Sequence, residues 1–279
     1  MLSINSSSYL RRSPSRIFIV ILTSIMSLNT LSLCQQAVMG SVGHATLDHR
    51  ADGTILLSVN NGSWPEVQVL NRIRREYGWI IDYEQEAQVP DAIVTRPDGR
   101  LQPKPHSVSV SIPQPVQGSS AEEFGILTAL GRGLSDTHER ANVLSAGGDG
   151  RFDFVFSSSN SVPILSTVIS IPSASRSVEE TINVILQAVS ARTSQHISRG
   201  GMADSSLETT QVSVGGNQAS PARLLLAQAL DALPTRHVWL LTYEPQERSY
   251  VFGVEPVVRA VRTASGQMME IPVKTSSKQ

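Results

Sequence analysis

A six-residue pattern that occurs twice is the strongest constraint on this fold. The sequence WIIDYE at residues 79–84 returns as WLLTYE at residues 239–244, a distance of 160 residues. Each copy follows a helix-like stretch and is typical of a strand, with aromatic side chains at alternate positions. Recurrence of this kind indicates repeated packing units. The pattern therefore predicts a duplicated helix-then-strand unit in which Trp79 and Trp239 share one packing role.

The N-terminus is typical of an export signal. Three arginines within residues 11–16 precede an apolar run, residues 17–33, that is too short and too polar for a membrane-spanning helix. We predict a signal peptide over residues 1–40, cleaved after Gly40 or Ala45, and a body that is exported to the periplasm or held at the bacterial envelope. An uncleaved N-terminal anchor is the alternative.

The single cysteine of the chain lies at the end of this segment. The sequence Leu31-Ser32-Leu33-Cys34 resembles a bacterial lipobox, which makes Cys34 a candidate for lipidation. The alternative is that Cys34 is discarded with the signal peptide. In either case the exported body has no disulfide and depends on its hydrophobic core for stability.

Charge and composition narrow the function classes. The formal net charge of −1 becomes −4 when the three arginines of the first 40 residues are left out. A weakly acidic body argues against nucleic-acid binding, which needs basic residues clustered on one face. With 40% hydrophobic residues, the chain has the composition of a globular protein and the length for one large or two small domains.

Helix and strand signals fall into two series. The first, residues 46–160, contains a helix that begins with a capping box at Ser63–Glu66 and ends at Gly78, and a proline-rich loop over residues 90–105. Its strand at residues 79–83 is followed by acidic residues. Asp82, Glu84 and Glu86 alternate there, and we interpret them as a solvated edge face.

The second series covers residues 161–260. A strand is expected over residues 164–171, and a capping box at Ser177–Glu180 opens a helix with a continuous apolar stripe. Ser220-Pro221 begins the next helix. Residues 261–279 are expected to be a polar C-terminal tail.

These signals predict an α+β fold. We expect two tandem β-α-β-β-α-β(-β) modules, with helices packed on one face of small mixed sheets. This order, with a helix that runs into an aromatic-rich strand, resembles the short N-terminal (STN) domain shared by secretins and TonB-dependent receptors. The stretches Val67–Glu84 and Ser177–Tyr250 carry the resemblance. It implies a periplasmic, non-enzymatic module that docks onto other envelope proteins. A membrane barrel normally follows such modules, and the loop at residues 84–106 is longer than the family pattern.

No catalytic, cofactor or metal motif is present in the sequence. There is no Gly-x-Ser-x-Gly elbow, P-loop or dinucleotide-binding glycine pattern. No two histidines have a spacing that places both on one helix face as metal ligands. The glycine-rich segment at residues 147–153 lacks the acidic ladder of a calcium loop and is typical of a hairpin turn. We therefore assign no catalytic residues, no cofactor and no metal ligands.

The sequence favours an exported, non-catalytic protein that binds another envelope protein. Candidate contact residues are the basic helix face Arg72, Arg74 and Arg75, together with Trp64. Contact with the membrane is expected only through an uncleaved or lipidated N-terminal segment. Two alternatives stay open. One is a glycan- or small-ligand-binding protein that uses Trp64 or the loop at residues 90–105, and the other is a hydrolase with a dispersed site.

Overall fold

A computed structural model describes residues 45–87, 93–115, 120–135, 140–145, 150–157, 162–200, 204–216 and 218–275. Residues 42–279 form one compact unit, distinct from residues 1–41. The predicted signal peptide and Cys34 lie outside the described residues. Within the described ranges, no helix is long and apolar enough to cross a membrane.

The protein is a mixed α+β structure, which confirms the predicted fold class. Its described part holds five α-helices: α2 (Pro65–Tyr77), α3 (Ser120–Leu134), α4 (Val178–Thr193), α5 (Ser205–Thr209) and α6 (Ala222–Asp231), with a 3-10 turn, η3, at Ile164–Ser166. The strands are β1 (Thr46–His49), β2 (Thr54–Gly62), β3 (Ile80–Gln85), β4 (Ile93–Thr95), β5 (Leu101–Pro103), β6 (His106–Pro113), β7 (Arg140–Ser145), β8 (Arg151–Ser157), β9 (Val168–Ile169), β10 (Ala174–Ser177), β11 (Ile197–Arg199), β12 (Gln211–Val214), β13 (Ser220–Pro221), β14 (His237–Glu244), β15 (Ser249–Pro256), β16 (Val258–Arg262) and β17 (Met268–Pro272).

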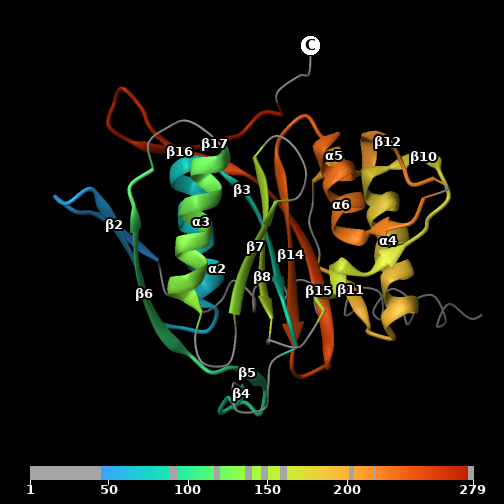
Figure 1. Ribbon diagram of the computed structural model, residues 1–279, viewed down its shortest axis with the longest axis horizontal. Helices are drawn as coiled ribbons and strands as arrows, with labels where there is room; N and C mark the ends of the chain where they lie inside the picture. Colours follow the sequence, from blue (N-terminus) through green and yellow to red (C-terminus); the bar gives the residue numbers. More distant parts are fainter. Residues whose placement is uncertain are drawn as a thin grey trace, which may run out of the picture. The chain divides into compact units, whose positions relative to one another are not determined.

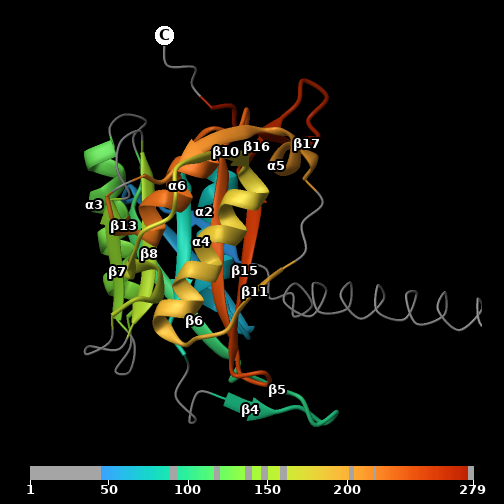
Figure 2. The ribbon, with the colours of Figure 1, turned by 90° about the vertical axis from the view of Figure 1, so that its right-hand side faces the viewer.

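A six-stranded sheet with the order β11-β15-β14-β3-β8-β7 lies at the centre of the compact unit (Figure 1). Strands β14, β3 and β8 are parallel, and β11 is parallel to β15, whereas the hairpins β14-β15 and β7-β8 are antiparallel. Helices α2 and α3 lie between one face of this sheet and the smaller sheet β1-β2-β6. Helices α4 and α6 cover the opposite face, as Figure 2 shows, and contact the strand pairs β10-β12 and β9-β13.

Helices therefore cover both faces of the central sheet, whereas we expected them on one face only. Two large hydrophobic cores result, together with a small cluster of Ile80, Val238 and Val257. Strand β14 contributes to both, with Trp239 in the core below α4 and α6 and Leu240 in the core below α2 and α3. Strand β3 places Ile81 and Tyr83 in the α2–α3 core only. The other face of β3 is equally enclosed but carries charged residues, which are described below.

The two tryptophan-bearing segments lie side by side but occupy different places in the fold. Strand β3 follows α2 and has a parallel neighbour on each side, whereas β14 follows α6 and turns directly into its antiparallel partner β15. Leu240 pairs with Tyr83, three residues away from the alignment of the two motifs. The predicted equivalence of Trp79 and Trp239 is therefore wrong. Both segments are central strands, which favour aromatic and aliphatic residues.

The helix-end signals are confirmed at the start of α4 and at the end of α2, and are wrong at the start of α2. At α4, the Glu180 N–H donates to the Ser177 hydroxyl at 3.1 Å and the Ser177 N–H donates to the Glu180 carboxylate at 3.2 Å, which forms the capping box. Gly78 ends α2 with φ 73°, and its N–H donates to the Arg74 carbonyl. The start of α2 differs from prediction, because the cap position falls on Trp64 and no side-chain hydrogen bond caps the helix there.

Three further segments differ from the predicted elements. Residues 164–171 form η3 and the two-residue strand β9 in place of one strand. Helix α6 begins at Ala222, because β13, the pair Ser220–Pro221, is hydrogen-bonded to β9. The segment 261–279, expected to be a polar tail, contains β17, which forms a hairpin with β16. Part of the proline-rich loop also forms a hairpin, β4-β5, which projects at the bottom of Figure 2.

Candidate functional site

Two of the predicted contact residues lie at the C-terminal half of α2, beside the β16-β17 hairpin. Arg72 donates to Glu76 one helical turn later at 3.1 Å. Arg75 reaches Glu270 of β17 at 3.2 Å, and both of these side chains are about half exposed. The hairpin thus packs against α2 and shares a surface with this basic helix face.

The other two predicted contact residues are placed differently. Arg74 is only 4% exposed and lies 3.8 Å from Glu255, so it belongs to the packing between α2 and the end of β15. Burial lowers the pKa of Arg74, although the negative charge of Glu255 opposes that effect. Trp64 is half-buried at the opposite end of α2. The four residues therefore do not form one patch.

The hairpin beside Arg72 and Arg75 carries a group of exposed apolar side chains. Met268 is 62% exposed and Met269 is 51% exposed, although both lie in a strand. We define the hairpin surface as the six residues Arg72, Arg75, Val261, Met268, Met269 and Ile271. Val261, Met269 and Ile271 share one face of the hairpin, whereas Met268 is on the other face with Glu270, which binds Arg75. Exposed apolar groups gathered on one element, with charged residues at their margin, are typical of protein-binding sites.

A buried ionic cluster lies between the central sheet and α6. Arg151 of β8 donates to both carboxylate oxygens of Asp82 on β3, at 2.9 and 2.7 Å, and to Asp231 at the end of α6, at 2.9 Å. It also donates to the His237 carbonyl at 2.9 Å. The Asp82 carboxylate accepts a further hydrogen bond from the Trp239 N–H. One arginine thus joins β3, β8, β14 and α6.

A second arginine extends the cluster from α6. Arg223 donates to Asp153 of β8 at 2.9 Å, to Glu84 of β3 at 2.7 Å and to the Ser166 hydroxyl at 2.9 Å. Glu84 also accepts from the Leu165 N–H at 2.9 Å. The side chains of Asp153, Glu84 and Arg223 are 0%, 2% and 6% exposed. These contacts connect residues that lie 139 positions apart in the sequence.

Burial dominates the electrostatics of this cluster. It raises the pKa of Asp82 and of Glu84, although their arginine partners oppose the shift. The pKa of Asp153 is raised to about 7, mainly by burial and also by the charge of Asp82, because these two aspartates are direct neighbours on parallel strands. For Arg151, burial lowers the pKa, but the charges of Asp82 and Asp231 raise it above the usual value.

This cluster corrects our interpretation of the acidic strand face. Asp82 and Glu84 were expected to be solvated on an edge strand, but they are 0% and 2% exposed on a central strand. Glu86, just beyond the strand, is half-buried. A sheet covered by helices on one face would have left these carboxylates in water. Because α6 covers the second face, they are buried and need the arginines.

The sequence contains a signal for the buried ionic cluster that our interpretation did not include. Arg151 and Asp153 alternate with phenylalanines in β8, and Arg223 is the only charged residue before Asp231 in the apolar helix α6. Charges of both signs inside apolar elements indicate buried ion pairs. The partner of each charge could not be read from the sequence, since the pairs join elements 69 to 139 residues apart.

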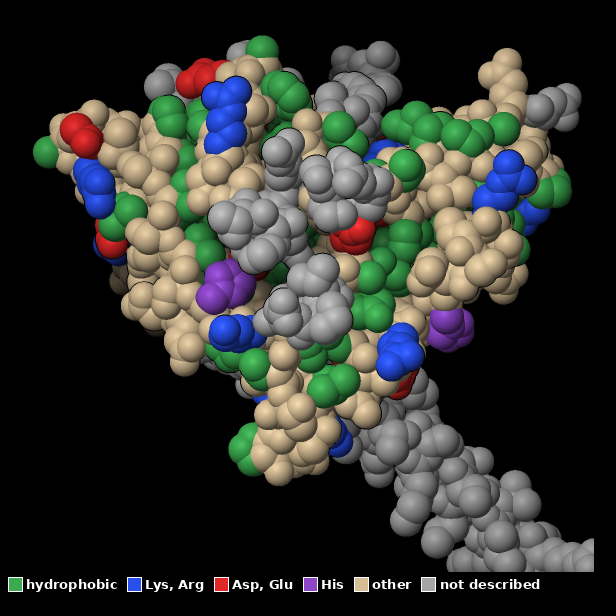
Figure 3. Space-filling model, turned by 60° about the horizontal axis from the view of Figure 1, so that its bottom comes forward, with side chains coloured by type: hydrophobic (Ala, Val, Ile, Leu, Met, Phe, Trp, Pro, Cys, Tyr) green, Lys and Arg blue, Asp and Glu red, His purple; other side chains and the backbone are tan. Residues whose placement is uncertain are grey.

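On the face shown in Figure 3, acidic and basic side chains are scattered among uncharged ones. Among the residues that the structure describes, no group of three or more His, Cys, Asp and Glu side chains could hold a metal ion. Comparison of the chain with models of known protein families, with curated proteins and with solved structures gives no match.

Proposed function

We propose that this chain is an exported, non-catalytic protein of a bacterial envelope that binds another envelope protein, and that it is built from two tandem modules at residues 46–160 and 161–260. The observed element order supports the two modules. When the short elements β4, β5, η3, β9, α5 and β13 are left out, the series β2-α2-β3-β6-α3-β7-β8 is followed by β10-α4-β11-β12-α6-β14-β15. In each series the strand after the first helix is parallel to the last strand, which is antiparallel to the strand before it.

This order is also the β-α-β-β-α-β-β pattern on which the STN resemblance rests. Under this proposal β3 corresponds to β11, and β14 corresponds to β7. The modules join at the edge between β14 and β3, so that their sheets merge into one. The STN family consists of docking modules, so the likeness in strand order favours a docking module by analogy of fold.

The hairpin surface is the observation that supports a protein partner. Four of its six residues are large apolar side chains that are 38% to 62% exposed. Arg72 and Arg75 lie on the neighbouring helix α2, where they bind Glu76 and Glu270 and place charge next to the hairpin. This arrangement is typical of an interface whose apolar centre supplies affinity and whose charged rim supplies specificity.

The state of the buried carboxylates favours a non-catalytic role. Asp82, Glu84 and Asp153 each bind an arginine and are at most 2% exposed, so water and substrates do not reach them. A general acid or base must lie within hydrogen-bond reach of its substrate. The cluster is better suited to holding the sheet and α6 together.

A partner-capture experiment with matched variants tests the proposal. The tagged full chain is incubated with detergent-solubilised envelope from its own source, and the recovered proteins are identified and quantified. We expect one protein to be recovered in stoichiometric amount, and we expect its recovery to fall at least about tenfold with Met268→Ser/Met269→Ser/Ile271→Thr. The control, Leu101→Ser, removes an exposed apolar side chain from the β4-β5 hairpin and should leave recovery unchanged.

Two results would contradict the proposal. One is recovery of no protein in repeated experiments, and the other is equal recovery by the parent chain and the hairpin variant. Export is tested separately by intact-mass measurement of the chain isolated from its source. A mass that begins at residue 41 or 46 indicates cleavage, and a lipid adduct on Cys34 indicates a lipoprotein. A full-length mass in the cytosolic fraction would contradict export.

A further inference from the structure

Strand β11 lies at one edge of the central sheet and directs backbone hydrogen-bonding groups away from it. Among the strands that the structure describes, it is terminal in this sheet and pairs with β15 alone. The Tyr250 N–H donates to the His196 carbonyl, and the Gly200 N–H donates to the Phe252 carbonyl, both at 2.8 Å. Since backbone groups of successive residues point to opposite sides of a strand, the N–H and C=O groups of Ile197 and Arg199 point away from β15.

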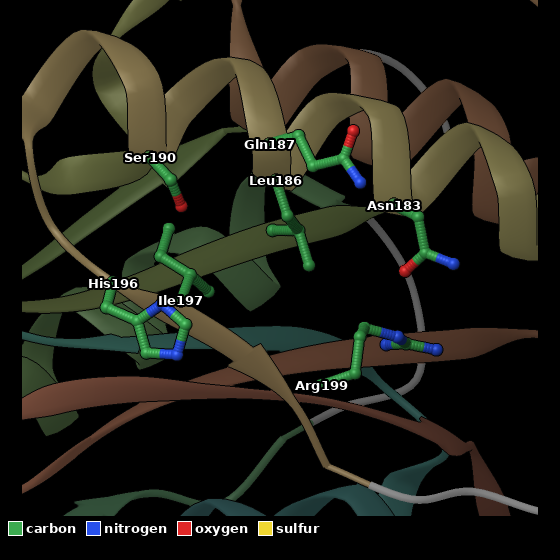
Figure 4. A pocket seen from close by; sticks show the side chains of 7 residues that line it. All are labelled: Asn183, Leu186, Gln187, Ser190, His196, Ile197 and Arg199. Atoms are coloured by element: carbon green, nitrogen blue, oxygen red, sulfur yellow. The ribbon is translucent and has the colours of Figure 1, made fainter. Parts of the chain in front are cut away.

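A groove lies along this edge, between β11 and α4. Its volume is about 340 Å³. Figure 4 shows the helix above and the strand below, with Leu186, Ser190 and Asn183 directed from the helix toward the strand. The helical side of the groove is a stripe at three- and four-residue spacing, formed by Asn183, Leu186, Gln187 and Ser190, and the strand side is formed by His196, Ile197 and Arg199.

The lining selects a particular kind of occupant. Leu186 and Ile197 are buried and make an apolar floor, whereas the amides and hydroxyl around them can bond to a backbone or to polar side chains. The lining contains an arginine and a histidine but no carboxylate, which disfavours a basic ligand. Arg199 is held in place by Glu179, at 2.6 Å, and by the ring of Phe252, 5.4 Å from its guanidinium.

The dimensions of the groove match a short extended peptide. From Asn183 to Ser190 the helix advances about 10 Å, at about 1.5 Å per residue. A strand covers that distance with about three residues, at about 3.3 Å each, which is also the length of β11.

We propose that the groove between α4 and β11 binds an extended segment of another protein, which adds to β11 as a seventh strand. The segment pairs with the outward backbone groups of Ile197 and Arg199. It places one small aliphatic side chain on the floor formed by Leu186 and Ile197, and its flanking residues are neutral or acidic. Main-chain pairing supplies affinity and the floor supplies selectivity, as in other cases of strand addition. This site is separate from the hairpin surface and does not depend on it.

The probe for this site is a phage-displayed library of random dodecapeptides, selected on the purified full chain. Enriched peptides are synthesised, and their affinities are measured by fluorescence anisotropy. We expect an alternating pattern with a small aliphatic residue at one position and few basic residues. Methylation of the backbone nitrogens at alternate positions should abolish binding, because strand addition needs those N–H groups. In hydrogen exchange, the amides of Ile197 and Arg199 should gain protection when peptide binds.

Two tryptophan variants on α4 locate the binding site. Ser190→Trp fills the groove and should weaken peptide binding at least about tenfold, equivalent to about 1.4 kcal/mol. The control Ala191→Trp is exposed on the same helix outside the groove lining and should change binding less than about twofold. Circular dichroism and urea midpoints should confirm that both variants fold. The hairpin variant should bind the same peptides as the parent chain.

Three results would overturn the proposal. One is that no peptide is enriched. Another is that the two tryptophan variants bind peptide equally. The third is that the amides of Ile197 and Arg199 are already protected in concentrated protein without peptide, which would show that this edge pairs with a second copy of the chain. None of these results bears on partner capture by the hairpin surface, so the two proposals fail independently.

Discussion

Replacement of Arg223 by alanine should destabilise the protein more than any surface substitution. The change removes three hydrogen bonds from α6 and leaves Glu84 and Asp153 buried without their cation. Removal of one partner of a buried ion pair costs about 3–5 kcal/mol, and domains of this kind are stable by about 5–15 kcal/mol. We therefore expect Arg223→Ala to lose roughly a fifth or more of the free energy of unfolding at pH 8.

The loss should depend on pH in a defined direction. Without Arg223, the folded-state pKa values of Glu84 and Asp153 rise further above their unfolded values. A carboxyl with a raised folded pKa stabilises the fold below its unfolded pKa and loses that contribution as pH rises through its folded pKa. The difference in stability between the parent chain and Arg223→Ala should therefore be smaller at pH 6 than at pH 8.

Urea unfolding followed by tryptophan fluorescence measures these quantities, since two of the three tryptophans, Trp79 and Trp239, lie in the cores. The control Arg192→Ala removes an exposed arginine from α4 and should change stability by less than about 0.5 kcal/mol. The triple variant Arg223→Met/Glu84→Gln/Asp153→Asn removes the charges together and should lose less than Arg223→Ala. Equal losses for the two arginine variants, or a loss for Arg223→Ala that is the same at both pH values, would refute the reasoning.

Three further predictions concern single positions. Burial raises the pKa of Asp153 from 3.8 to about 7, so the parent chain should lose on the order of 4 kcal/mol of stability between pH 4 and pH 8, and Asp153→Asn should flatten that slope in urea titrations. Ser177→Ala removes half of the α4 capping box and should cost about 1 kcal/mol, whereas a loss below about 0.3 kcal/mol would show that the cap contributes little. In α3, a Cβ at Gly133 would lie 2.4 Å from Val110 Cγ1, but a Cβ at Gly125 meets no atom within 4 Å. Gly133→Ala should therefore lower the free energy of unfolding and Gly125→Ala should raise it, by about 1 kcal/mol each. Thermal midpoints of the two variants should shift in opposite directions, and a shift of the same sign for both would contradict this account.

Local signals in the sequence predicted local structure well. Gly78 ends α2, Ser177 and Glu180 cap α4, and the apolar stripe of α4 is buried, because each of these features depends on neighbours within one or two turns. The repeat of WIIDYE and WLLTYE was less informative. It reflects the shared demands of two central strands, and strand composition does not distinguish a strand after the first helix from one after the second.

Predictions about the environment of a residue were less successful. The acidic residues of β3 were interpreted correctly as one face of a strand, but whether that face meets water or α6 depends on how the chain returns about 140 residues later. The hairpin surface was partly predicted through Arg72 and Arg75. Its apolar half lies in β17, within a segment that looked like a polar tail. The groove at β11 could not be predicted, because it needs the order of strands in the sheet.

The ionic cluster makes the two proposed modules interdependent. If the second module unfolded alone, α6 would withdraw Arg223, and β14 would withdraw the Trp239 N–H from Asp82. In the first module, Glu84 and Asp153 would then lie on an uncovered face of the sheet. The phenylalanines of β8 pack in the core on the other face of the same sheet. Because the buried ion pairs of Arg223 with Glu84 and Asp153 join the two modules, residues 46–275 should unfold in one transition despite their tandem order. Far-ultraviolet circular dichroism and tryptophan fluorescence should therefore give coincident urea curves. A plateau between two transitions would show instead that each module is stable alone, and that the buried charges are paired only after the modules have folded.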